Sequence, residues 1–193
     1  MRICKYPSVF LLVISVFLNG CAVIDKIKAP SAGVSPATSS FVVVKAEVIV
    51  RGAIGITTSQ QLQGGVLLRT DGSNRIDGRA AAGLIIFPDV PPGEYSLTQI
   101  QTTWQQGNIV RSNTYDVPAD KVLNYVFDAK LGEPKYLGVV TIEDVRKPGE
   151  RGINYGINDD KQEEIAAWEK ISQIYQGSLW VNEVQKRLSE LRQ

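Results

Sequence analysis

The sequence predicts a mainly β protein, an antiparallel β-sandwich of about seven strands followed by a C-terminal helical hairpin. Residues 41–145 consist of short runs of β-branched and aromatic residues that alternate with turn residues. This region has no long segment with apolar residues at helical spacing, whereas residues 158–192 show that spacing. Hydrophobic residues make up 44% and charged residues 21% of the chain, which is typical of a globular protein.

The first residues are typical of a bacterial export signal. Arg2 and Lys5 precede an apolar run over residues 9–18. A helix that spans a bilayer needs roughly 20 apolar residues, so this shorter run predicts a signal peptide over residues 1–20. The run leads into Leu18-Asn19-Gly20-Cys21, which resembles the lipobox of bacterial lipoproteins.

The lipobox resemblance implies a lipid anchor. Leu18 and Gly20 stand where the signal peptidase recognises its substrate, and Cys21 stands where the sulfur receives a diacylglycerol before cleavage makes this cysteine the amino terminus. Asn19 is a less usual residue at its position. Each buried acyl CH₂ contributes about 0.8 kcal/mol, so two or three chains anchor a protein stably. The alternative is a signal anchor with an incidental cysteine.

The residue after the cysteine indicates a location. Ala22 stands where an aspartate would otherwise retain a lipoprotein, which resembles the pattern of lipoproteins passed to the outer membrane of Gram-negative cells. We therefore expect an envelope protein that is lipid-anchored at the periplasmic face or the surface of the outer membrane. Residues 29–40 are rich in Pro, Ser, Ala and Gly, so we expect residues 21–40 to form a flexible tether.

The domain after the tether, residues 41–145, is expected to hold the sandwich. Expected strands cover residues 41–50, 65–70, 84–87, 94–104, 109–117, 121–129 and 135–143. Turn residues lie between them at 71–74, 88–93, 106–108, 118–120 and 131–134.

One of these turns carries a second resemblance. Residues 87–97, FPDVPPGEYSL, resemble a hairpin of transthyretin-like and carboxypeptidase regulatory-like domains, and residues 136–142, YLGVVTI, resemble the last strand of related surface lipoproteins. Within the first segment Pro92 fixes φ and Gly93 supplies the turn. The resemblance implies an immunoglobulin- or transthyretin-like sandwich, in a class of domains that mostly bind, space or stabilise.

The carboxyl-terminal part is expected to contain a linker over residues 146–157 and a helical hairpin over residues 158–192. Asn158 is the predicted N-cap of a helix, and the acids Asp159 and Asp160 follow in its first turn. Gly177 followed by Ser178 predicts the end of that helix and the cap of the next. Apolar residues at helical spacing are Ile165, Trp168, Ile171, Ile174 and Tyr175, then Trp180, Val184, Leu188 and Leu191. So small a hairpin must pack on the sandwich or on a partner.

Residue usage excludes several chemistries. The sequence has no histidine, and its two cysteines are Cys4 and Cys21, so histidine triads, histidine-metal sites and a disulfide framework are excluded. Asp71, Asn74 and Asp77 lack the spacing of a calcium loop and fit an ordinary turn. We therefore expect no enzyme, no metal and no cofactor.

The net charge of the chain argues against nucleic-acid binding. The formal net charge is +1, and removing Arg2 and Lys5 from the 21 basic residues leaves 19 against 20 acidic ones, a net charge of −1. A nearly neutral chain offers no electrostatic attraction for a phosphate backbone.

Three tryptophans form the candidate binding surface. For Trp168 and Trp180 the hairpin core is the favoured alternative, while Trp104 stands at a strand end beside Gln105-Gln106-Gly107. We expect a membrane-anchored, non-catalytic interaction, accessory or assembly protein that holds an envelope protein partner through the hairpin and its junction with the sandwich. The alternative is a lipoprotein that binds a small ligand or a carbohydrate, which requires a concave aromatic-lined site.

Overall fold

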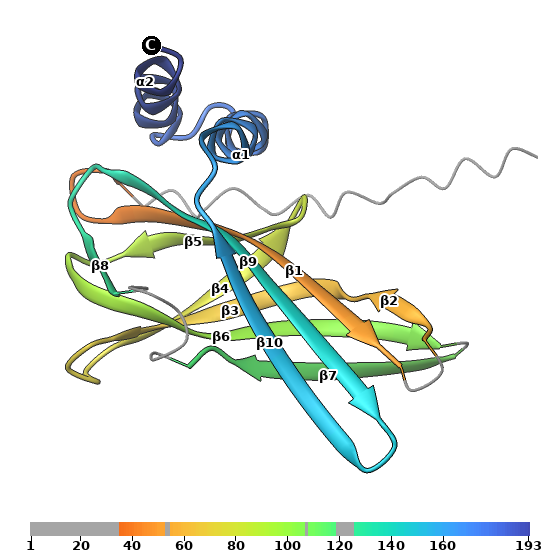
Figure 1. The fold of residues 1–193 in the computed structure, drawn as a ribbon. Coiled ribbons are helices and arrows are strands. Elements are labelled where there is room, and N and C mark those ends of the chain that lie inside the picture. Colours follow the sequence, from red (N-terminus) through yellow and green to blue (C-terminus); the bar gives the residue numbers. More distant parts are fainter. Residues whose placement is uncertain (1–34, 53–54, 107, 119–125) are drawn as a thin grey trace, which may run out of the picture.

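The computed structural model describes residues 35–52, 55–106, 108–118 and 126–193. These residues form one sheet and two helices, shown in Figure 1. The predicted signal peptide, the lipobox and the predicted tether up to residue 34 lie outside the described residues. No helix in the described part of the chain combines the length and the apolar character that crossing a bilayer requires.

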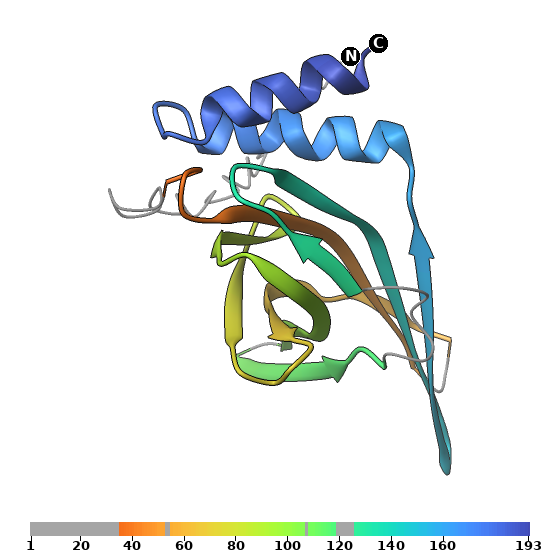
Figure 2. The same cartoon turned by 90° about the vertical axis from the view of Figure 1, so that its left-hand side faces the viewer.

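The fold is mainly β, as predicted, but its sheet differs from a seven-strand antiparallel sandwich. The strands are β1 (Ser40–Arg51), β2 (Thr57–Ser59), β3 (Gln61–Arg69), β4 (Arg75–Ala81), β5 (Leu84–Val90), β6 (Gly93–Gln106), β7 (Ile109–Asp116), β8 (Val126–Ala129), β9 (Pro134–Lys147) and β10 (Glu150–Asn158). They form one sheet in the order β10-β9-β1-β5-β4-β3-β6-β7, with β2 added to β1 and β8 to β6. The sheet curls over itself (Figures 1 and 2).

A parallel pair accounts for the difference. β1 and β9 run parallel, whereas the other pairs among the described strands are antiparallel. Their register shifts between Val43 and Lys45, opposite Gly138, whose φ of +86° suits glycine. Two strands separated by residues 52–133 thus lie side by side in the sheet, a pairing that alternation within each strand does not encode.

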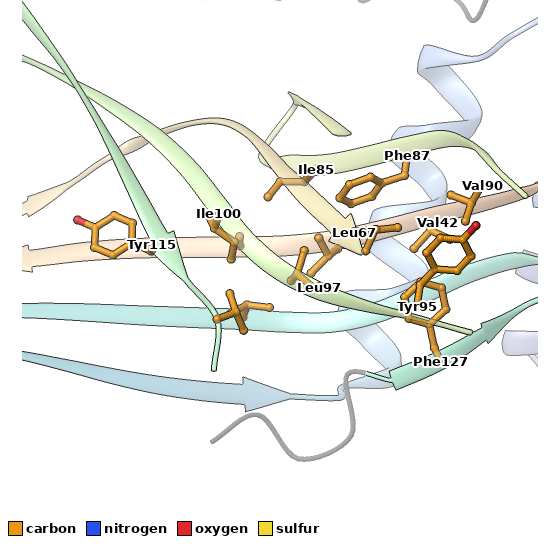
Figure 3. Close-up of a cluster of buried hydrophobic side chains, with 14 of the residues drawn as sticks. Val42, Leu67, Ile85, Phe87, Val90, Tyr95, Leu97, Ile100, Tyr115 and Phe127 are labelled. Atoms are coloured by element: carbon orange, nitrogen blue, oxygen red, sulfur yellow. The ribbon is translucent and has the colours of Figure 1, made fainter. Parts of the chain in front are cut away.

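The concave face of the curled sheet holds an inner core. Nearly all of its buried side chains come from β1, β3 and β5 to β9, and Figure 3 shows most of them converging between the strands. The inner core consists of Val42, Val44, Ala46, Val48, Leu67, Ile85, Phe87, Val90, Tyr95, Leu97, Ile100, Tyr115, Val117, Phe127, Ala129, Val140 and Ile142. Alternate residues of β1, at positions 42, 44, 46 and 48, therefore face the inner core.

The outer face of the same strands holds a second core under the helices. α1 (Lys161–Ile174) and α2 (Val181–Leu191) lie across one side of the sheet (Figure 2). This outer core consists of Phe41, Val43, Leu84, Ile86, Tyr136, Ala167, Trp168, Ile171, Tyr175, Trp180, Val184, Leu188 and Leu191. The first half of β1 is therefore buried on both faces, which explains its continuous apolar run.

Several predicted boundaries are corrected. Residues 146–157 are not a linker, because they form the end of β9 and most of β10. Strands β2 and β4 were not predicted, and residues 88–90 extend β5 instead of opening a turn. The predicted tether ends in a turn at residues 36–38, and β1 begins at Ser40.

The structure shows why β4 escapes prediction. Its Gly78 lies under the Phe87 ring, so closely that an added Cβ would come within 2.5 Å of the ring. β4 then turns into β5 through Ala82 and Gly83, which both have positive φ, 50° and 80°. Glycine normally argues against a strand, and Gly78 is favoured here only because the Phe87 ring lies on top of it. The local sequence therefore does not predict β4.

The two helices begin differently. The predicted cap at Asn158 is wrong, because Asn158 ends β10 and Asp160 caps α1. The Asp160 carboxylate accepts bonds from the backbone N–H groups of Gln162 and Glu163. The predicted cap at Ser178 is wrong, because α2 begins after Trp180 and has no side-chain cap bond. Gly177 has the positive φ expected near a helix end, 78°.

Candidate functional site

The candidate site lies at the open end of the sheet. We use this term for the end that carries the β6–β7 and β9–β10 hairpins and the last residues of β1, opposite the helices (Figure 1). Its inner face is lined by polar and aromatic side chains that continue the rows of the inner core.

Trp104 and Arg111 form a pair near the outer limit of this face. They stand opposite each other on β6 and β7, and the Arg111 guanidinium carbon lies 5.6 Å from the centroid of the Trp104 ring. This is a cation–π contact. Beyond it, Ile109 and Val110 are 56% and 64% exposed, and both are apolar. Trp104, Arg111 and Ile109 thus lie on one face of two adjacent strands, and Val110 lies on the opposite face of β7.

A polar network lies one pair deeper. Thr102 and Asn113 stand opposite each other, and both donate to the side-chain oxygen of Gln60, Asn113 Nδ2 at 3.1 Å. Thr102 is fully buried, so its hydroxyl needs this partner. The network fixes the strands beneath Trp104 and closes the apolar inner core toward the open end.

A buried carboxylate dominates the other wall of the open end. Asp144 on β9 is 0% exposed and accepts hydrogen bonds from Arg146 Nη2 at 2.8 Å and Arg151 Nη2 at 2.9 Å. The Tyr115 hydroxyl donates to the same oxygen at 3.1 Å. Burial by itself raises the pKa of the Asp144 carboxyl, but the hydrogen bonds and charges of the two arginines prevail and hold the pKa at about 2.

The tyrosines at this end join strands that have no backbone pairing. Tyr115 on β7 reaches Asp144 on β9, and the Tyr155 hydroxyl on β10 donates to the backbone oxygen of Asp116 at 2.6 Å. β7 and β10 are the two ends of the strand order. Side chains therefore tie the edges of the curled sheet together.

This cluster suits a structural role better than catalysis. A carboxyl with a pKa of about 2 is ionised at neutral pH and is a weak base, far from the pKa that general base catalysis favours. Burial also raises the pKa of Tyr115, so its hydroxyl keeps its proton. Both arginines are bound to Asp144, and they use their charges there.

A cleft lies between α2 and the beginning of β9. This cleft has a volume of about 430 Å³ and is lined by Gly132, Glu133, Pro134, Lys135, Tyr136, Asp159, Glu164, Glu183, Lys186, Arg187 and Glu190. At its floor Glu164 accepts from Trp168 Nε1 and Arg187 Nε, both at 3.0 Å. The deepest charge of the cleft is therefore already paired.

The three tryptophans of the predicted binding surface lie in two different environments. Trp104 is partly exposed at the open end, as predicted for a strand end. Trp168 and Trp180 are 0% exposed, with ring centroids 6.4 Å and 5.4 Å from the Phe41 ring, so neither lies on a surface. The hydrophobic driving force places these rings in the outer core, the alternative that the apolar stripe favoured.

The remaining predicted residues divide in the same way. Val184 and Leu188 are buried with the tryptophans, so the apolar stripe of the hairpin packs on the sheet. Asp71 accepts two hydrogen bonds from Ser73, and Asp77 pairs with Arg75, as ordinary turn and surface residues do. Among the described residues no group of three or more acidic side chains is placed to hold a metal ion. Leu18, Gly20 and Cys21 lie outside the described residues.

Sequence reasoning missed the Asp144 cluster. Its arginines lie in the segment that was assigned to a linker, and its tyrosine lies in another hairpin. One signal was present, since Ile142, Asp144 and Arg146 alternate on one face of an extended segment.

The chain matches no protein-family model, no curated protein and no solved structure.

Proposed function

We propose that this protein is a non-catalytic, lipid-anchored interaction protein of the bacterial envelope, which holds a protein partner at the open end of its sheet. The gathering of Trp104, Arg111, Ile109 and Val110 on β6 and β7 carries the proposal. Tryptophan and arginine are the residues that dominate binding energy at protein interfaces, and exposed aliphatic side chains supply apolar area. The lipobox resemblance and the absence of histidine support the anchor and the lack of catalysis.

The backbone of β7 supports the same surface. β7 pairs with β6 along one side, and no other described strand pairs with its second side. Natural edge strands usually carry lysine, proline or a cover that prevents association, whereas the exposed start of β7 carries Ile109 and Val110. A partner strand or loop can pair with this edge while its side chains contact Trp104.

Site-specific photo-cross-linking in cells tests the proposal. A photoreactive residue at position 110 is expected to give one adduct of defined mass in the envelope. Val126, which is 49% exposed and lies on β8, is the matched control and is expected to give none. Trp104→Ala is expected to reduce the adduct at position 110 at least about tenfold, because loss of an interface tryptophan costs about 2 kcal/mol or more.

Two results would contradict the proposal. Equal adducts at positions 110 and 126 would indicate random collisions, and an unchanged adduct in Trp104→Ala would remove the tryptophan from the interface. Thermal unfolding of the variant must match the parent, so that a change in cross-linking reports the surface.

The cleft beside α2 supports the second candidate function, binding of a small polar ligand. Its volume of about 430 Å³ falls in the range of ligand pockets, but charged residues rather than aromatic ones line most of it. A carbohydrate would instead stack on Trp104. Protection of thermal unfolding by a panel of soluble glycans and charged metabolites, abolished by Lys186→Glu or by Trp104→Ala, would identify either ligand class and its site.

A further inference from the structure

We propose that the end of the molecule where the described chain begins lies on the bilayer, with Leu131 and Leu179 in contact with its apolar boundary. The inference rests on the proposed lipid anchor and adds an orientation to it. Leu131 is 51% and Leu179 66% exposed, in two different turns. The occupant of this surface is the membrane itself, and the open end is left to face away from it.

Leu131 lies beside the first described residues. It stands in the turn between β8 and β9, where the Gly132 N–H donates to the Ser39 backbone oxygen at 3.0 Å. The Ser40 hydroxyl donates to the Glu133 backbone oxygen at 2.7 Å. These bonds hold the turn against the entry of the chain into β1.

Leu179 approaches the same place from the helices. It precedes Trp180, whose ring centroid lies 5.4 Å from that of Phe41, the second residue of β1. Tyr175, on the other side of the turn, lies 5.2 Å from the same ring. Figure 2 shows the turn between α1 and α2 close to the beginning of β1. Two exposed leucines are thus placed near the point where the anchor segment joins the domain.

The length of the anchor segment keeps this end of the molecule near the bilayer. Ser35 stands only 14 positions after Cys21 in the sequence. At most about 3.6 Å per residue, they reach about 50 Å when fully extended. A lipid on Cys21 therefore keeps the leucines at high effective concentration near the bilayer, and a weak apolar contact is then sufficient to orient the domain.

Charge does not explain the contact. The exposed charges around Leu131 cancel, since Lys130 and Lys135 accompany Asp128 and Glu133. We therefore assign the contact to apolar insertion, and it should be the same on zwitterionic and on anionic lipid. Leucine side chains at an interface reach about 5–10 Å into the headgroup and acyl boundary.

Single-cysteine probes test the orientation. The sequence has no cysteine after Cys21, so Leu131→Cys and Leu179→Cys each introduce one labelling site into the lipidated mature chain. Ile109→Cys and Val110→Cys are matched controls, with similar exposure at the open end. Each protein carries an environment-sensitive fluorophore and is reconstituted in phosphatidylcholine vesicles, with or without phosphatidylglycerol, that contain acyl-chain quenchers.

Quenching is expected to be several-fold stronger at positions 131 and 179 than at 109 and 110, on both lipid mixtures. Leu179→Ser is expected to reduce quenching at position 131 several-fold, while Ile109→Ser leaves it unchanged. Equal quenching at both ends overturns the proposal. An unchanged signal at 131 in Leu179→Ser also overturns it, because proximity through the anchor alone would then explain the contact.

Failure of the anchor is recognised separately. Flotation of the same vesicles reports whether Cys21 holds the protein on lipid. A Cys21→Ser chain with an amino-terminal histidine tag, bound to nickel-chelating lipid, carries the same probes and gives the orientation whether or not Cys21 is lipidated. If the parent does not float while the tagged chain shows the expected quenching pattern, the proposed lipid anchor on Cys21 is wrong. The proposal that Leu131 and Leu179 face the membrane is then still supported.

Discussion

At one end of the curled sheet, the outer faces of β1, β5 and β9 lie under two helices, and at the other end the edges meet through polar side chains. The helical end buries Trp168, Trp180 and Tyr175 around Phe41. The open end instead buries one carboxylate between two arginines and a tyrosine. The stabilisation from apolar burial is roughly proportional to the buried area and is not directional. The polar cluster, in contrast, stabilises the fold only while every partner is present.

This difference indicates where function can change without unfolding the protein. The aromatic side chains that the helical end buries, Trp168, Tyr175 and Trp180, have no exposed face, so a substitution of one of them acts on stability. Trp104, Ile109 and Val110 at the open end are exposed or partly exposed and support little of the core. A surface that evolves toward a partner therefore belongs at the open end.

Removal of residues 158–193 should have the largest effect. It exposes the outer faces of β1 and β5, including Phe41 and Ile86, which are 0% and 1% exposed in the intact protein. We expect the truncated chain to lose cooperative unfolding in thermal scans followed by circular dichroism. A folded, soluble truncated sheet would show that the hairpin is an accessory element and would restore it as a candidate binding surface.

Trp168→Ala should have the next largest effect. The ring is fully buried, and removal of a buried tryptophan costs about 3–5 kcal/mol through lost burial and the cavity left behind. Urea unfolding measures the difference in the free energy of unfolding, with Trp104→Ala as the matched control at the open end. Equal losses for the two variants would contradict the contrast between the two ends.

Asp144→Asn should destabilise the protein by about 2 kcal/mol at neutral pH, because a shift from 3.8 to about 2 corresponds to roughly that free energy. The pKa of the folded state is depressed, so the stabilisation is present above pH 3.8 and is lost as the pH falls toward 2. Urea unfolding at a series of pH values measures the free energy of unfolding. Below pH 4 this free energy should fall less in the variant than in the parent. If the free energy of unfolding depended on pH in the same way in both proteins, Asp144 would not be a cause of the acid sensitivity.

Much of the β architecture follows from the sequence, since strands 41–50, 84–87, 94–104, 109–117 and 135–143 all lie within or close to observed strands. Helical spacing also predicts both helices and the residues that they bury. The pairing of strands could not be predicted in the same way, because the parallel neighbours β1 and β9 are brought together only by the curl of the whole sheet.

The candidate site was partly accessible to the same reasoning. Trp104 stands out as an aromatic residue at a strand end, but its cation partner Arg111 becomes evident only when the register of β6 and β7 is known. The Asp144 cluster collects residues from β7, β9 and β10, of which the last was interpreted as a linker. Long-range polar contacts have no periodicity that a sequence could display.

The Trp104–Arg111 pair should have the smallest effect on stability. A cation–π contact at an exposed site contributes about 0.5–1 kcal/mol, so Trp104→Ala and Arg111→Ala should each change the free energy of unfolding only slightly. A double-mutant cycle isolates their coupling from the loss of packing, because each single variant removes the contact. Partner cross-linking at position 110 should nevertheless fall in both variants. A large loss of stability with unchanged cross-linking would reverse the assignment and make this pair part of the scaffold, as Trp168 is at the helical end.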